Sequence, residues 1–136
     1  MVVAQKVEGP YEIHDFTVAV GTTISAMTLC KLTSPRTASA STAGSTADVP
    51  IPFAGIAFTE KPSTSNATQM GLATKGTFNI YADADVTAGR LVTMSGTNMI
   101  TPMLDDGALM SGAVVGKALQ DITAGSAGEI RVGEII

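Results

Sequence analysis

Tryptophan is absent from this 136-residue sequence, cysteine occurs once, and aromatic residues make up only 4%. The single cysteine, Cys30, excludes an internal disulfide and any zinc site built from several cysteines. Because Cys30 lies between apolar residues, we expect a buried and inert thiol. No apolar run approaches the roughly 20 residues that a membrane-spanning helix needs, and the N-terminus lacks the pattern of a secretory signal. We therefore expect no membrane partner.

Charge is also scarce, since charged residues make up 15% of the chain, against about 25% in an average soluble domain. The net charge is −4, and the eight basic residues are scattered rather than clustered. Nucleic-acid binding is therefore not expected, because it requires a basic surface that displaces phosphate counterions. A large uncharged surface is rarely left bare on a soluble monomer, which favours self-association or docking on another protein.

Short segments of alternating apolar and polar residues predict an all-β fold with little helix. The clearest of them is 11–18. Further short candidate strands, separated by turn-forming residues, are 27–32, 53–58, 71–73, 77–81, 90–94, 99–103, 113–119 and 129–132. Their regular spacing indicates a compact sandwich or barrel-like body. Only 105–111, opened by an aspartate, predicts a single helical turn.

The chain divides into an N-terminal arm, residues 1–10, and a single β domain, residues 11–136. We expect the arm, which ends at Gly9-Pro10, to be loose until a partner binds it and to be dispensable for the fold. Residues 33–48 contain no large apolar side chain. They are predicted to form a mobile surface loop, because they bury too little apolar surface to offset the entropy of ordering.

The strand pattern recurs, which predicts two similar β units over about residues 16–82 and 83–136. The offset between matching residues of the two units changes along the chain, and the changes fall in loops, where insertions cost little. Two such units would bury each other's apolar faces in one body. The residues that align are Leu29 with Leu91 at an offset of 62, Gly55 with Gly116 at 61, and Leu72 with Ile130 at 58.

Residues of the kind that carry chemistry are few and do not form a recognisable motif. His14 and Asp15 are adjacent, so on a strand their side chains point to opposite faces and cannot form a relay. No Gly-x-Ser-x-Gly nucleophile motif is present. Four aspartates could in principle approach one another, but they lack the calcium-loop pattern and are interpreted as solvated turn residues: Asp83, Asp85, Asp105 and Asp106. We expect no enzymatic activity, no metal and no cofactor.

Three strand-and-turn phrases resemble the small capsid decoration, or head cement, proteins of tailed bacteriophages and related viruses. The phrases are 87–92 (Thr-Ala-Gly-Arg-Leu-Val), 115–121 (Val-Gly-Lys-Ala-Leu-Gln-Asp) and 127–132 (Ala-Gly-Glu-Ile-Arg-Val). The resemblance covers about residues 16–136. It implies a β-rich subunit, usually a trimer at local three-fold positions of the shell, whose N-terminal arm reaches onto neighbouring capsid subunits. The family has no catalytic residues to carry over.

The resemblance thus predicts a structural virion protein, made in the host cytoplasm, that stabilises the outer surface of the capsid. Its expected partners are the major capsid protein and further copies of itself. The arm could add a strand to an exposed capsid edge, which makes the hypothetical capsid-binding residues Val2, Val3, Ala4, Gln5, Lys6 and Val7. Two alternatives stay open: a tail-tube or other virion β structural protein, and a small non-viral β binding or carrier domain.

Overall fold

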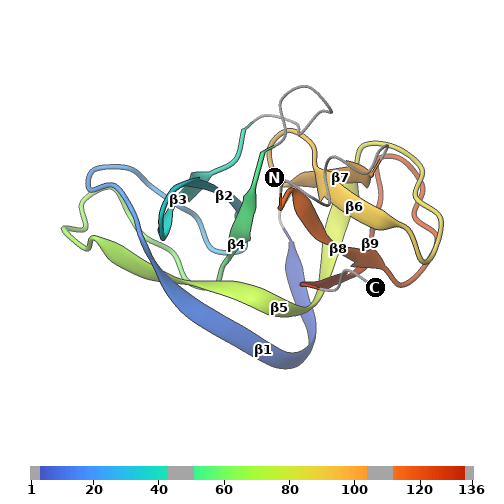
Figure 1. The fold of residues 1–136 in the computed structure, drawn as a ribbon, viewed down its shortest axis with the longest axis horizontal. Helices are drawn as coiled ribbons and strands as arrows, with labels where there is room; N and C mark the ends of the chain where they lie inside the picture. Colours follow the sequence, from blue (N-terminus) through green and yellow to red (C-terminus); the bar gives the residue numbers. More distant parts are fainter. Residues whose placement is uncertain (1–3, 43–50, 104–111, 134–136) are drawn as a thin grey trace.

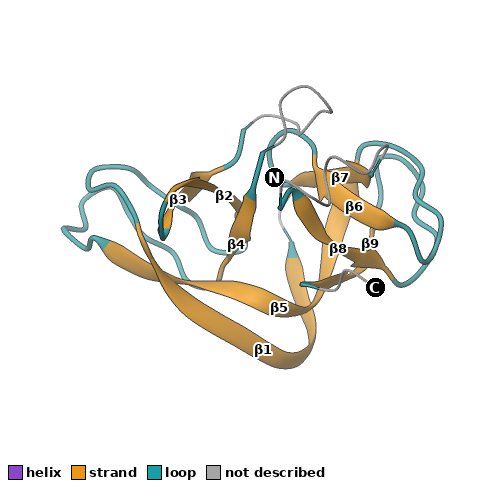
Figure 2. Cartoon of the chain, viewed as in Figure 1, coloured by secondary structure: helices purple, strands orange, loops and turns teal. Residues whose placement is uncertain are grey.

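A computed structural model of the chain describes residues 4–42, 51–103 and 112–133. This described part consists of strands and connections without a helix, as Figure 2 shows. The all-β fold expected from the sequence is confirmed, while the helical turn predicted at 105–111 lies outside the described residues. The strands are β1 (Gln5–Thr17), β2 (Leu29–Ser34), β3 (Thr37–Ala40), β4 (Phe53–Ala57), β5 (Gln69–Ala82), β6 (Leu91–Met94), β7 (Met99–Pro102), β8 (Val114–Ala118) and β9 (Ala127–Val132).

The sheet closes on itself twice, and β5 belongs to both closures. The strand order is β1-β3-β2-β4-β5-β7-β6-β8-β9, with additional pairings of β1 with β5 and of β5 with β9. The first ring is therefore β1-β3-β2-β4-β5, and the second is β5-β7-β6-β8-β9. In Figure 1, β2, β3 and β4 lie on one side of the long β5, and β6 to β9 gather around its other end. The barrel-like body predicted from the sequence is thus two small rings of strands.

The two rings repeat each other down to individual backbone hydrogen bonds, which confirms the pseudo-repeat. Each begins with an isolated bridge, Ile24 to Lys61 in the first and Val86 to Ile122 in the second. In the first ring β2 pairs antiparallel with β3 and β4, and in the second ring β6 pairs antiparallel with β7 and β8. Each ring also contains one parallel pair, β1 with β3 or β5 with β7. Two matched bonds illustrate the repeat: Met27 N to Ala57 O at 2.6 Å, and Gly89 N to Ala118 O at 2.8 Å.

Some elements differ from those that the sequence predicts. Segments 71–73 and 77–81, expected as separate strands, are one fourteen-residue strand, β5. The rings therefore share this strand instead of dividing at residue 82. Within the predicted loop 33–48, residues 37–40 form β3 because their small side chains fit between β1 and β2, and Ala38 is buried. The rest of that loop from 43 onward lies outside the described residues.

The expected loose arm is a strand over residues 5–10. These residues are the first part of β1, and Gln5, Lys6 and Glu8 pair with Asn79, Phe78 and Thr77 of β5. The backbone pairing with β5 holds this part of the chain in place although its own side chains are exposed. The local sequence could not show this pairing, because the partner is about seventy residues away.

The core has two clusters that follow the rings. One lies inside the first ring and includes Cys30, Ala38 and Leu72. The other cluster fills the second ring and includes Phe78, Ile80, Val92 and Ile100. It also contains three residues of the first ring whose side chains point away from the interior of the first ring: Leu29, Ile56 and Ala73. The rings therefore pack against each other through apolar side chains, as two matching units were expected to do.

The matched glycines Gly55 and Gly116 allow neighbouring strands to approach closely in both rings. A Cβ atom on Gly55 would lie 2.9 Å from the carbonyl oxygen of Ala73, which is closer than real Cβ contacts. A Cβ atom on Gly116 would collide in the same way with the carbonyl oxygen of Arg131. The repeat of this glycine in the sequence is thus a packing requirement of the ring.

Candidate interaction surface

β1 is the most exposed strand of the protein and lies at an edge. It runs beside β5 along the lower border of the view in Figure 1. On its other side, the described residues provide one pairing only, Thr17 with Thr37 of β3. Apart from Tyr11 and Phe16, which are half-buried, every side chain of β1 is exposed. An unpaired strand edge presents backbone donors and acceptors that can pair with another chain.

Two hydrogen bonds show which backbone groups of β1 point away from β5. The N–H of Thr17 donates to the carbonyl of Arg36 at 2.6 Å. The guanidinium of Arg36 donates in turn to the carbonyl of Asp15 at 2.5 Å. The register is regular from Ile13 to Thr17, and backbone direction alternates along a strand. The backbone groups of Ile13 and Asp15 therefore point outward as well.

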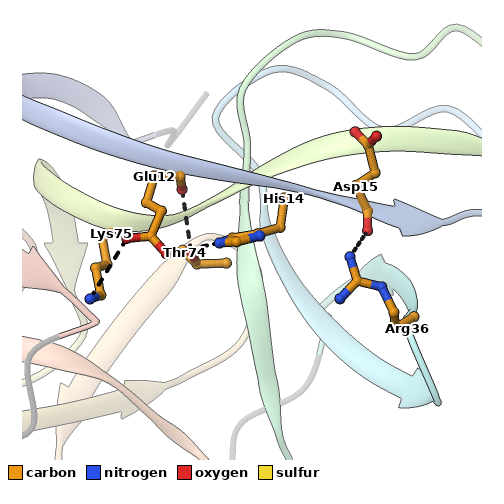
Figure 3. A network of polar contacts seen from close by, with 6 residues as sticks. All are labelled: Glu12, His14, Asp15, Arg36, Thr74 and Lys75. Carbon is orange, nitrogen blue, oxygen red and sulfur yellow. Dashed lines mark hydrogen bonds and ion pairs between the residues drawn. The ribbon is translucent and has the colours of Figure 1, made fainter.

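A polar network lies on the same part of β1, as Figure 3 shows. Nε2 of His14 is 2.9 Å from Oε1 of Glu12, and Nζ of Lys75 is 3.7 Å from the other carboxylate oxygen. The hydroxyl of Thr74 donates to the carbonyl of Glu12. The hydrogen bond from His14, followed by the charge of Lys75, lowers the pKa of Glu12 below its usual value. These side chains are about half exposed, so the network contributes little to stability.

The acidic partner of His14 is Glu12 and not the adjacent Asp15. In Figure 3 the Asp15 carboxylate points away from the imidazole. Sequence reasoning considered only adjacent residues and missed Glu12. The signal was present, because residues two apart on a strand share a face. The Asp15 carboxylate itself makes no hydrogen bond or ion pair with the described residues.

The six hypothetical capsid-binding residues have different positions in the structure. Val2 and Val3 lie outside the described residues. Ala4 is 1% exposed and belongs to the core of the second ring, so its side chain is not available to a partner. The remaining three lie on β1 and are exposed: Gln5, Lys6 and Val7. The Lys6 ammonium is 4.6 Å from the centre of the Phe58 ring.

Other groups that were considered for chemistry are engaged locally. Asp83 accepts a hydrogen bond from the hydroxyl of Ser95, and Asp85 accepts one from the N–H of Ala124 at 2.9 Å. Asp105 and Asp106 lie outside the described residues. Among the residues that the structure describes, no three metal-binding side chains gather at one place. The aspartates 83 and 85 thus act as turn residues.

Cys30 is fully buried in the first ring, as the sequence predicts. Burial raises the pKa of its thiol to about 12. A thiol with this pKa is protonated at neutral pH and is a poor nucleophile. Among the described residues, no helix is both long enough and apolar enough to cross a membrane.

Comparison with known proteins finds a match in structure. No protein-family model and no curated protein matches the chain. The fold is similar to the crystal structure of the N base of head fiber gp8.5 of bacteriophage phi29, with a TM-score of 0.54 and 14% identity, over 89% of this chain and 94% of that one. At this identity the likeness shows a shared fold. The structural neighbour is a phage head protein, as are the decoration proteins that the sequence resembles.

Proposed function

We propose that this chain is a structural protein of a phage virion that binds the outside of the assembled capsid and stabilises it, as a homotrimer. The observation that carries the proposal is the fold shared with a phage head fiber base over nearly the whole of both chains. The phrases at 87–92, 115–121 and 127–132 support it independently, because they resemble decoration proteins in sequence. Under this proposal the major capsid protein is the partner, and neither catalysis nor a cofactor is involved.

The physical properties of the molecule suit that role. A protein that binds the assembled lattice better than separated subunits stabilises the lattice by linkage. Two closed rings joined by β5 provide a stiff body, and β1 offers a long exposed strand for contact. Three copies acting together would hold the shell by avidity even where each single contact is weak.

The direct test adds the purified protein to capsids of the same phage that lack it. Sedimentation with the capsids should saturate at a fixed ratio, and cryo-electron microscopy should place density at the local three-fold positions. The decorated shell should also withstand a higher temperature than the bare shell. Absence of saturable binding would contradict the proposal, and polymerisation of the free protein into open-ended tubes would favour a tail-tube component.

Removing residues 1–9 would not test the predicted contacts of the N-terminal segment. The truncation would delete the buried Ala4 and the pairing of β1 with β5 along Gln5–Glu8. Weaker binding would then reflect damage to the fold. A substitution of an exposed side chain is the sharper experiment.

Val7 provides such a substitution, since its side chain is 42% exposed on β1. Val7→Asp should weaken attachment to capsids about tenfold by placing a charge in the contact, with circular dichroism unchanged. Val20→Asp is the matched control, because Val20 is also an exposed valine but lies in the turn after β1. Equal binding of both variants would remove this segment from the interface.

A further inference from the structure

The two rings place β1 and β5 in equivalent positions, so one strand shows what the other can bind. In the first ring Ile13, His14 and Asp15 pair with 73, 72 and 71 of β5. In the second ring Thr77, Phe78 and Asn79 pair with 131, 130 and 129 of β9. Each trio lies just before the parallel pairing with the next strand, at Thr17 or at Tyr81. Ile13–Asp15 on β1 thus corresponds to Thr77–Asn79 on β5.

The outer edge of β5 at Thr77–Asn79 is occupied by an extended antiparallel segment. This segment is residues 5–8 of the same chain, with Gln5 opposite Asn79 and Glu8 opposite Thr77. Phe78, in the middle of that edge, is completely buried. The fold therefore already contains one strand docked beside the parallel pair of a ring.

The equivalent edge on β1 has no such strand among the described residues. His14, which corresponds to Phe78, keeps 46% of its side chain exposed. The outward backbone groups lie at Ile13 and Asp15, and Arg36 closes the edge on the side of β3. Because the Asp15 carbonyl is taken by Arg36, the open backbone groups in the described part of the chain are the N–H and carbonyl of Ile13 and the N–H of Asp15.

The side chains beside this edge define what a docking strand would carry. Ile13 is 45% exposed and lies on the same face as Asp15, two residues along the strand. The Asp15 carboxylate has no ionic partner in the described part of the chain. Directly opposed residues on paired strands interact, so a cation suits Asp15 and a branched apolar residue suits Ile13.

We propose that the open edge of β1 at Ile13–Asp15 binds an extended antiparallel segment of the capsid shell. This segment carries Lys or Arg opposite Asp15 and a branched apolar residue opposite Ile13. The inference rests on the proposed function, because it takes the shell as the partner. It also specifies the site, the strand direction and the chemistry of the segment.

A second copy of the chain fits this edge poorly. Antiparallel pairing of two β1 strands about His14 would set Asp15 of one copy against Ile13 of the other, leaving both carboxylates without a cation. Centring the pair on Asp15 would set the two carboxylates opposite each other, which destabilises a pair of strands. Centring it on Ile13 would set Asp15 opposite Tyr11, again without a cation. A Lys or Arg side chain of another protein would give the Asp15 carboxylate the ionic partner that a second copy does not.

The test compares Asp15→Lys with Glu60→Lys in full-length protein bound to capsids that lack it. Both substitutions reverse one exposed carboxylate, and Glu60 lies in the turn after β4, off the β1 edge. Asp15→Lys should lower capsid affinity at least about tenfold, and Glu60→Lys should not. Hydrogen exchange of the wild type should slow at the amides of Ile13 and Asp15 when the protein is on the capsid. Circular dichroism confirms that both variants are folded.

The outcomes separate the two proposals. If the wild type saturates capsids and Asp15→Lys binds equally well without new protection at 13–15, the edge site is wrong and the capsid function stands. If the wild type does not bind capsids, both are wrong. If the free wild type self-associates and Asp15→Lys alone abolishes this, the edge binds a second copy, which also overturns the proposed partner.

Discussion

The two rings have the same strand connections but are filled differently. At three matched positions the first ring has the smaller side chain: Cys30 for Val92, Ala38 for Ile100, and Ala54 for Val115. All six are buried. At three other matched positions the first ring has the larger side chain: Val18 for Ala82, Ile24 for Val86, and Met70 for Gly128. The same backbone is therefore filled by different side chains in the two rings.

The ends of the rings differ even more. Phe78 closes the second ring and is packed against Tyr11, with ring centroids 5.3 Å apart. Its counterpart His14 lies half exposed in a polar network with Glu12. A repeated unit can thus keep one copy tightly closed for stability and leave an edge of the other available. The proposed capsid contact lies on the less closed ring.

Matched turns show the same division. Asn98 and Arg36 both adopt the left-handed conformation at equivalent positions, with φ of 58° and 51°. The Asn98 side chain is buried and accepts a hydrogen bond at 3.0 Å from the N–H of Leu29, which ties the rings together. Arg36 reaches outward to Asp15 and lies over the Phe16 ring. The Asn98 turn thus stabilises the contact between the rings, and the Arg36 turn binds the exposed edge of β1.

The largest expected difference between the rings comes from truncating the matched residues Phe78 and His14. Phe78→Ala should reduce the free energy of unfolding by about 4 kcal/mol, because it leaves a cavity in the core. His14→Ala should change it by less than about 0.5 kcal/mol, because the side chain is in solvent. Urea denaturation followed by circular dichroism measures both values. Similar losses would show that the end of the first ring is packed as tightly as that of the second.

The matched glycines give the next largest effect. Gly116→Ala should destabilise the protein by about 3 kcal/mol, since the added methyl group collides with the backbone of β9. Gly55→Ala should cost less, about 1 to 2 kcal/mol, because the contacts of the added methyl group with Leu72 and Ala73 are less severe. The same urea titration ranks the two variants. The reverse order would mean that the first ring is the more rigid one.

The effect that is smallest at neutral pH, and grows only at alkaline pH, comes from Cys30 in the first ring. Burial raises the thiol pKa from 9.0 to about 12, so the folded state favours the protonated thiol. This contribution is complete below pH 9 and is lost as the pH rises toward 12, at about 1.4 kcal/mol per pH unit. Cys30→Val, which copies Val92, should remove this component of the pH dependence. A thiol reagent should label the wild type only in denaturant, and rapid labelling at pH 8 would show that the first ring opens.

Much of the fold could be predicted from the sequence because its signals are local. Alternation of apolar and polar residues located the strands, and turn residues marked the gaps between them. The recurrence of Leu29, Gly55 and Leu72 as Leu91, Gly116 and Ile130 revealed two similar units. The glycine recurs because a Cβ atom would collide with the neighbouring strand at both positions. Cys30 was correctly expected in the core because its neighbours are apolar.

What only the tertiary structure decided is which strands lie side by side. Backbone hydrogen bonds between strands about fifty to seventy residues apart leave no mark in side-chain sequence, so the sharing of β5 and the pairing of β1 with it could not be predicted. The short strand β3 was missed for the same reason, as its neighbours rather than its own Thr, Ala and Ser side chains stabilise it. The open edge at Ile13–Asp15 can be recognised only by comparing it with the occupied edge at Thr77–Asn79. That comparison requires the three-dimensional structure of both rings.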